Sequence, residues 1–291
     1  MPTTILTSLA LLAFAANAIL CRFALGESDI DPASFTSIRL LSGAFSLFMI
    51  INLQRQKTPR LSSSSIHAST SHSSITSIYP PLMLFTYAST FSFAYMSLNT
   101  GTGALILYGA VQISMLSLSI INGHRPQMSE WLGMSLAFTG FVYLMLPGAD
   151  MPSLQGFILM SLSGIAWGIY SILGKQSQSP LFDTQRNFLY ALPLTLILSL
   201  SFISQSHLSS QGILLAITSG ALASGVGYVL WYAALTGLSG SLAAAVQLLV
   251  PIFAALGGVL WMNESISTRF ITAAIMVLGG IFLISYRPQS K

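Results

Sequence analysis

Residues 239–262 of this chain read SGSLAAAVQLLVPIFAALGGVLWM, a continuous run without one charged side chain. The hydrocarbon core of a bilayer is about 30 Å thick, and a helix needs roughly 20 apolar residues to cross it. The run is long enough to do so. It therefore predicts a transmembrane helix and argues against a soluble fold.

Nine further stretches of similar character lie along the chain, at residues 4–24, 33–53, 76–97, 102–121, 128–147, 154–174, 184–205, 210–235 and 268–286. Only 6% of the residues are charged, whereas soluble domains carry roughly 25%. The sequence thus predicts an all-α integral membrane protein with ten transmembrane helices. The first stretch lacks the basic segment of a signal peptide, so we interpret it as the first span.

The two halves of the chain resemble each other in spacing. Sixteen residues separate His124 from Gly140, and sixteen separate Glu264 from Gly280. The residues that follow Asn17 also align with those that follow position 167. We therefore predict two five-helix modules, residues 1–148 and residues 149–291. Since five is an odd number, the second module enters the membrane in the opposite direction, and such inverted repeats are typical of secondary transporters.

Basic residues are retained on the cytoplasmic side of a membrane, so their positions predict the orientation. With the N-terminus in the cytoplasm, the cytoplasmic segments hold eight of the eleven basic residues: Arg55, Lys57, Arg60, Arg125, Lys175, Arg186, Arg287 and Lys291. We predict a multi-pass protein of the bacterial inner membrane with both termini in the cytoplasm. The polar connection at residues 54–77, which contains His67 and His72, is expected to be a mobile loop.

Residues 240–264 resemble the EamA module of the drug/metabolite transporter superfamily. The second span is similar too, because these modules often carry an arginine where this chain has Arg39. In the first half, Val111 stands where the family has a proline, and His124 stands where it has a glutamate. The resemblance implies tandem five-helix modules and an exporter or exchanger of small metabolites, often amino acids, of the YddG-like kind.

Arg39 is a candidate for substrate binding because an ionisable group inside a membrane usually faces a partner or an aqueous cavity. It either attracts a substrate carboxylate, pairs with Glu264 or Glu27, or anchors the protein at the membrane surface. Arg22 lies at the end of a span, where long basic side chains usually act as anchors. Glu264 is expected to pair with loop backbone or with Arg269.

Neutral polar and aromatic side chains inside the apolar spans define the expected substrate site. Tyr108 and Gln112 share one face of the fourth span because they are four residues apart. Together with Arg39, the candidate substrate-binding residues are Asn17, Tyr108, Gln112, Trp167, Tyr170, Tyr228, Trp231 and Gln247. A cavity lined by spans one, four, six, eight and nine suits a small zwitterion and suits a metal ion poorly. The same groups also serve as helix–helix hydrogen bonds.

No catalytic residue, metal ligand or cofactor site is predicted. Residues 237–240 match a rhomboid-type protease motif, but the four histidines lie outside the predicted spans and leave Ser239 without a general base. No selectivity filter or ring of charges points to a channel. An intramembrane enzyme and an accessory membrane subunit are the alternatives to a transporter. The expected partners are a small-molecule substrate and the lipid bilayer, nucleic acid is excluded, and a homodimer is left open.

Overall fold

The computed structural model describes residues 2–27, 29–57, 78–123, 125–148, 151–174, 177, 179–235, 237–238 and 246–285. Within these residues the chain is helical, and its β-structure is limited to an isolated bridge between Ile30 and Leu208. Of the predicted loop at residues 54–77, residues 54–57 are helical, and the rest, with His67 and His72, lies outside the described residues. Residues 239–245 of the predicted ninth span also lie outside them.

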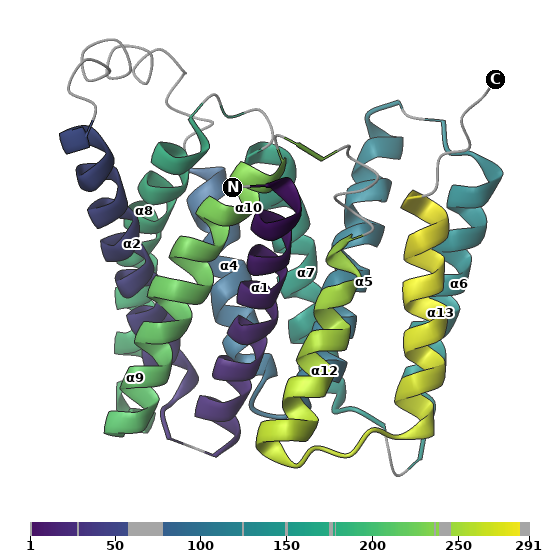
Figure 1. Ribbon diagram of the computed structural model, residues 1–291. Coiled ribbons are helices and arrows are strands. Elements are labelled where there is room, and N and C mark those ends of the chain that lie inside the picture. Colours follow the sequence, from purple (N-terminus) through teal and green to yellow (C-terminus); the bar gives the residue numbers. More distant parts are fainter. Residues whose placement is uncertain are drawn as a thin grey trace.

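The described residues form ten helical passes that stand side by side (Figure 1). The first half contributes α1 (Thr3–Gly26), α2 (Pro32–Lys57), α4 (Tyr79–Ala94), α5 (Thr100–Ile121) and α6 (Met128–Leu144). The second half contributes α7 (Leu154–Gly174), α8 (Pro180–Ser201) with the short turn η2 (Ile203–Gln205), then α9 (Ser210–Thr218), η3 (Ser219–Val226), α10 (Gly227–Leu235), α12 (Leu249–Met262) and α13 (Thr268–Ser285). The segments α9, η3 and α10 follow one another without a break and together form the eighth pass.

The fold is that of an all-α membrane protein. Among the described residues, five passes are by themselves long and apolar enough to cross a bilayer, namely α1, α2, α5, α7 and the eighth pass. The helices α12 and α13 are shorter apolar helices. The remaining helices, α4, α6 and α8, pack against α7, α13 and α2, respectively. The start of α1 and the end of α13 lie at the same end of the bundle (Figure 1), which follows from an even number of passes.

Local sequence signals explain several helix ends. Helix α8 begins at Pro180, since proline fits the first turn of a helix. The predicted span was 184–205, so both ends of α8 lie four residues earlier than predicted. Helix α6 begins with a capping box, in which Gln127 N donates to Glu130 Oε2 at 2.7 Å. Helix α12 ends at Asn263, which has the left-handed conformation (φ 51°) common after helices.

Packing between the halves follows the inverted repeat, in which each pass corresponds to the one five passes later. Helix α2 packs on its counterpart α8, α5 on α12, and α6 on α13. The contact of α1 with the eighth pass corresponds to that of α4 with α7, and the contact of α1 with α12 corresponds to that of α5 with α7. The predicted module boundary at residues 148 and 149 stays a prediction, since residues 149 and 150 lie outside the described part.

Helices α6 and α13 meet through small residues at equivalent positions. A Cβ atom on Gly133 would come closer than 3.0 Å to the carbonyl oxygen of Gly280, and a Cβ on Gly280 would come equally close to that of Gly133. A Cβ on Gly140 would lie 3.2 Å from the carbonyl oxygen of Ala273. Gly133 and Ala273 are 140 positions apart, as are Gly140 and Gly280. This offset equals that between His124 and Glu264 in the predicted repeat.

The middle of the eighth pass, η3, is a π-helix. This rare form occurs frequently at functional sites. It packs against α1 and α2, and its two serines, Ser219 and Ser224, are buried. The segment therefore directs hydroxyl groups from the second half toward two helices of the first half.

Candidate functional site

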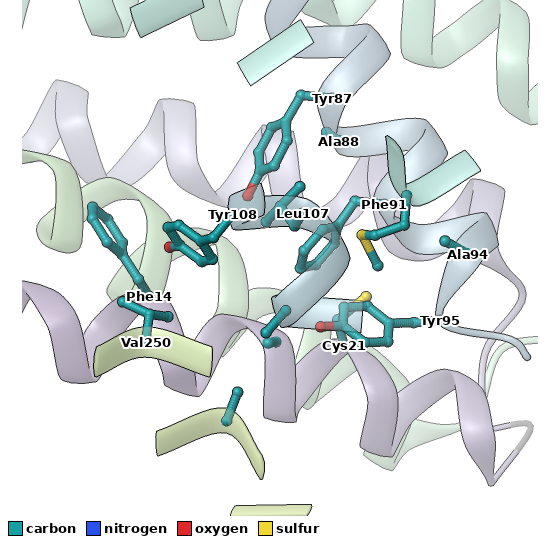
Figure 2. Packing of buried hydrophobic residues seen from close by; sticks show 14 of the residues in the cluster. Phe14, Cys21, Tyr87, Ala88, Phe91, Ala94, Tyr95, Leu107, Tyr108 and Val250 are labelled. Atoms are coloured by element: carbon teal, nitrogen blue, oxygen red, sulfur yellow. The ribbon is translucent and has the colours of Figure 1, made fainter. Parts of the chain in front are cut away.

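The centre of the bundle contains a small cavity to which both halves contribute. Figure 2 shows Tyr87, Phe91 and Tyr108 converging from α4 and α5, with Phe14 of α1 nearby. The lining consists of Phe14, Asn17, Ala18, Tyr87, Phe91, Ala104, Leu107, Tyr108, Trp167, Ala223, Ser224 and Tyr228. The cavity leaves about 20 Å³ for the centres of water-sized molecules, and roughly 10–15 Å³ by this measure holds one water. An organic solute therefore fits only if the helices move apart.

Aromatic rings form much of the cavity wall. The ring centroid of Trp167 lies 4.8 Å from that of Tyr87 and 5.1 Å from that of Tyr228. Phe14 meets Tyr228 edge-on, with the two centroids 6.1 Å apart. Rings from α1, α4, α7 and α10 thus present flat faces, which attract both apolar groups and cations.

A chain of neutral hydrogen bonds crosses the cavity wall. Asn17 Nδ2 donates to Tyr87 Oη at 3.4 Å, and Ser219 Oγ donates to Asn17 Oδ1 at 2.7 Å. The chain connects α1 to α4 in the first half and to η3 in the second half. Asn17 therefore joins the two halves at the level of the cavity.

Arg39 lies directly behind this wall, and only 1% of its surface is exposed. Its Nη2 donates to Tyr87 Oη at 3.1 Å and its Nε donates to Ser224 Oγ at 3.3 Å. The guanidinium carbon is 5.3 Å and 5.0 Å from the centroids of two lining rings. Among the described residues, no carboxylate lies within 4.0 Å of its nitrogens. The surface-anchor interpretation and the pairings with Glu27 and Glu264 are therefore wrong.

A second polar network joins the halves at the end of the bundle opposite the termini, which we call the outer end (Figure 1). Arg22 Nε lies 3.3 Å from Glu264 Oε1, and Arg22 Nη1 donates to the carbonyl oxygen of Tyr95 at 3.0 Å. Glu264 also accepts from Thr100 N at 2.8 Å and from Thr100 Oγ1 at 3.1 Å. The predicted backbone partner of Glu264 is confirmed. Its predicted pairing with Arg269 is wrong, because Arg269 donates to backbone carbonyls after α6.

Two larger hollows lie at the outer end. One, of about 240 Å³, is lined by polar groups that include Asn99, Ser153 and Glu264. The other, of about 430 Å³, is mainly apolar and lies beside α4 and η2, with Phe93 and Phe202 in its wall. Arg22 pairs with a residue that lines the polar hollow, and its role as a membrane-surface anchor stays a prediction.

The structure brings part of the predicted site together. The cavity is lined by four of the predicted residues, Asn17, Tyr108, Trp167 and Tyr228. Tyr170 stacks behind Trp167 at 5.5 Å, and Trp231 packs behind Phe14 at 5.8 Å. Gln112 is buried and Gln247 is half-buried, but neither belongs to the described lining. Substrate contact by all of these residues stays a prediction.

Sequence reasoning missed the third pass. Tyr87 of α4 contacts Asn17, Arg39 and Trp167, so it occupies the centre of the site. The available signal was a polar aromatic residue inside an apolar stretch, the same criterion that identified Tyr108. Ser224 offered no such signal, because serines are common throughout these spans.

Residues 154–286 match the family model described as the EamA-like transporter family. An uncharacterized protein of Pseudomonas aeruginosa is 44% identical over 282 residues, which cover 97% of this chain and 94% of that protein. The chain belongs to the EamA-like transporter family.

Other relatives of this EamA-like chain bear the description uncharacterized transporter. YoaV of Bacillus subtilis is 23% identical, with 90% of this chain and 89% of that protein covered. A protein of Archaeoglobus fulgidus is 24% identical, with 99% and 98% covered. One crystal structure superposes with a TM-score of 0.64 at 16% identity, covering 95% of this chain and 97% of that chain, and this likeness shows the fold alone. The EamA-like chain is a membrane transporter of the drug/metabolite type.

Proposed function

We propose that the protein is a secondary transporter that carries small organic metabolites, foremost amino acids or similar zwitterions, across the bacterial inner membrane, and that it works as a YddG-like exporter. The observation that carries this proposal is the central cavity, which is lined by α1, α4 and α5 of the first half and by α7, η3 and α10 of the second. Inverted-repeat transporters bind their substrates at such an interface between repeats.

The lining favours a small organic substrate. Asn17, Tyr87 and Tyr108 offer amide and hydroxyl groups next to flat aromatic rings, a combination that holds polar and apolar parts of one molecule. Resident metal ions need several oxygen, nitrogen or sulfur ligands together. The described residues contain no group of three His, Cys, Asp or Glu side chains that could hold a metal.

Alternating access requires the cavity to open to one side at a time. The Arg22–Glu264 pair joins α1 of the first half to the end of α12 in the second half. In the predicted orientation, with both termini cytoplasmic, this pair closes the periplasmic side. Separation of the pair, together with rocking of the two halves, opens the cavity outward.

The positions of the acidic residues support facilitated export or exchange. In the described part of the chain, the Asp and Glu residues lie at helix ends or in connections, namely Glu27, Asp29, Asp31, Glu130, Asp183 and Glu264. A proton relay through the membrane usually needs an ionisable group within a span. The substrate gradient is therefore the proposed driving force.

Counterflow into proteoliposomes loaded with a panel of amino acids and other metabolites tests the proposal. We expect saturable exchange of one class of solute. The Tyr108→Phe variant removes one hydroxyl from the cavity. It should raise the solute concentration needed for half-maximal exchange about threefold to tenfold, the effect of one lost hydrogen bond. Tyr190→Phe is the matched control, because Tyr190 lies on the outside of α8 with 54% of its surface exposed, and it should leave exchange unchanged.

Absence of exchange for every solute, from protein shown to be folded, would overturn the transporter proposal. Equal loss in both tyrosine variants would overturn the assignment of the site to the central cavity.

A further inference from the structure

Two buried polar groups beside the central cavity have no hydrogen-bond partner among the described residues. They are Nη1 of Arg39 and the hydroxyl oxygen of Tyr228. A buried donor without a partner costs roughly 1–3 kcal/mol, and more if it is charged. Proteins rarely retain such groups, so each of them calls for an explanation, such as a catalytic role or a bound ion. Here two of them occur on facing helices.

The two groups adjoin the same part of the cavity wall. Tyr228 lines the cavity, and so does Ser224, which lies four residues earlier on the same pass. Ser224 Oγ accepts a hydrogen bond from Arg39 Nε at 3.3 Å. The guanidinium of Arg39 and the hydroxyl of Tyr228 are thus linked through residues one helical turn apart. The ring of Tyr228 is held between Trp167 and Phe188, with centroid distances of 5.1 Å and 5.9 Å.

Arg39 also lacks a counter-ion among the described residues. A guanidinium stays protonated in proteins, and a buried charge without a partner costs several kcal/mol. The rings of Tyr87 and Phe91 stabilise the cation by roughly 0.5–2 kcal/mol each, which offsets only part of that cost. An anion at Nη1 would complete both the charge balance and the hydrogen bonding.

We propose that Arg39 and Tyr228 form a carboxylate-binding site, and that the transported solutes are organic molecules that carry a carboxylate. This inference rests on the proposed transport function and specifies its substrate class. Nη1 of Arg39 and the Tyr228 hydroxyl each donate to the carboxylate, and hydrogen bonds of this charge-assisted kind are about twice as strong as neutral ones. The rest of the solute lies against Trp167 and Tyr108, whose ring faces accept either an ammonium group or an apolar side chain.

A matched pair of tyrosine variants separates binding from stability. In Tyr228→Phe the lost hydroxyl has no partner, so a purely structural tyrosine would lose nothing. In Tyr95→Phe the lost hydroxyl donates to the carbonyl oxygen of Thr100 at 3.2 Å and lies outside the cavity lining. We expect Tyr228→Phe to keep its unfolding temperature and to bind carboxylates about tenfold more weakly. Tyr95→Phe should melt earlier and bind them as the wild type does.

Arg39 variants test the charge. Arg39→Met removes an uncompensated buried cation, which often leaves a protein equally stable or more stable, and it should abolish carboxylate binding. Arg39→Lys keeps the charge but lacks the forked donors, so it should bind more weakly than the wild type. If Arg39→Met does not fold, the comparison of Tyr228→Phe with Tyr95→Phe tests the proposal by itself.

The measurement is the unfolding temperature of the detergent-solubilised full chain, titrated with isosteric pairs of carboxylate and amide. The pairs are propionate and propionamide, alanine and alaninamide, and phenylalanine and phenylalaninamide, with chloride and sulfate as inorganic controls. We expect at least one carboxylate to raise the unfolding temperature in a saturable manner and its amide to bind more than tenfold more weakly.

The inference is overturned if no carboxylate shifts the wild type, if amides bind as well as carboxylates, if inorganic anions act equally, or if Tyr228→Phe binds like the wild type. Counterflow distinguishes the two proposals. Exchange restricted to solutes without a carboxylate would overturn the carboxylate-binding site and support the transport function. Carboxylate binding without exchange of any solute would support the carboxylate-binding site and overturn the transport function.

Discussion

Two polar networks of different strength join the halves of this protein. In the centre, Asn17 connects to Tyr87 and Ser219 through hydrogen bonds between neutral groups, and such bonds contribute about 0.6 kcal/mol each in membranes. At the outer end, Arg22 and Glu264 carry full charges, and their hydrogen bonds are about twice as strong as neutral ones. The neutral hydrogen bonds of Asn17 can therefore rearrange around a substrate, whereas the outer end separates only when its ion pair is hydrated or replaced.

Replacing Glu264 by glutamine tests the outer ion pair. The amide is uncharged and has one acceptor oxygen where the carboxylate has two, so it loses the ion pair with Arg22 and one acceptor for the backbone N–H of Thr100. The two charged side chains are 20% and 11% exposed, so we expect a loss of roughly 2 kcal/mol, less than the 3–5 kcal/mol of fully buried pairs. Denaturant unfolding in detergent measures this change in the free energy of unfolding. Glu27→Gln, the same change at an exposed position, is the control. Equal stability of both variants would mean that the pair contributes nothing.

Single residues were predictable where their chemistry contrasts with the surrounding span. Asn17, Trp167 and Tyr228 were identified in this way, and all line the cavity. Arg39 was identified as well, but its depth was not, because a position near the end of a predicted span is compatible with both the surface and the interior. Its burial depends on Ser224, which is 185 residues away in the chain. A contact of that kind has no local signal.

At the scale of helices, the contacts that join the halves differ in their freedom to move. Helices α6 and α13 approach so closely at Gly133 and Gly280 that no methyl group fits between their backbones. Packed interfaces of this kind allow few alternative arrangements. The eighth pass has instead a π-helical segment at the cavity, a rare form of helix that occurs frequently at functional sites. We therefore expect α6 and α13 to stay together during transport while the eighth pass adjusts.

Neighbouring glycines in α13 provide a test of this contact. A Cβ at Gly280 would clash with the backbone of α6, whereas a Cβ at Gly279 would meet only the side chain of Leu136, at 3.9 Å. Gly280→Ala should therefore destabilise the protein by about 1–3 kcal/mol through overpacking. Gly279→Ala should stabilise it by up to about 1 kcal/mol, because alanine favours the helix. Thermal unfolding in detergent compares the two variants. A Gly280→Ala variant more stable than Gly279→Ala would contradict the assigned contact between α6 and α13.

The helices themselves followed from hydropathy, but their ends did not. Helix α4 covers residues 79–94, whereas the apolar stretch predicted 76–97. The extra residues include Tyr95, which is buried and apolar enough to extend a hydropathy window, yet it caps the helix. The π-helix was not predictable, because its register is set by tertiary packing against α1 and α2.

At the scale of the whole molecule, the pairing of helices repeats when the halves are exchanged. The 140-residue offset of the sequence repeat recurs in the contacts of Gly133 with Gly280 and of Gly140 with Ala273. The inverted arrangement was therefore predictable from spacing, because duplicated sequences keep equivalent positions at equivalent contacts. The pairing of Arg22 with Glu264 joins the two halves at the outer end, whereas the ion pair described at the other end, Asp183 with Arg186, lies within α8.

Reporter fusions test the predicted orientation. Green fluorescent protein joined after Lys291 should fluoresce, and alkaline phosphatase at the same place should be inactive, since eight of the eleven basic residues favour a cytoplasmic location for the termini. Phosphatase fused after Gly148 should be active, because this residue follows α6 in the connection at the outer end. The reverse pattern would invert the molecule and make the Arg22–Glu264 pair a cytoplasmic closure.

If the protein works by the proposed alternating access, the unbalanced charge of Arg39 makes transport sensitive to membrane voltage. When access switches from one side to the other, the guanidinium experiences the electrical potential of the side to which the cavity is open, even if it hardly moves. One elementary charge moved through 100 mV changes the energy by about 2.3 kcal/mol. In a cell whose interior is negative, this energy favours the empty carrier with its cavity open to the cytoplasm. The resting voltage would thus keep the empty site turned toward the compartment from which an exporter loads.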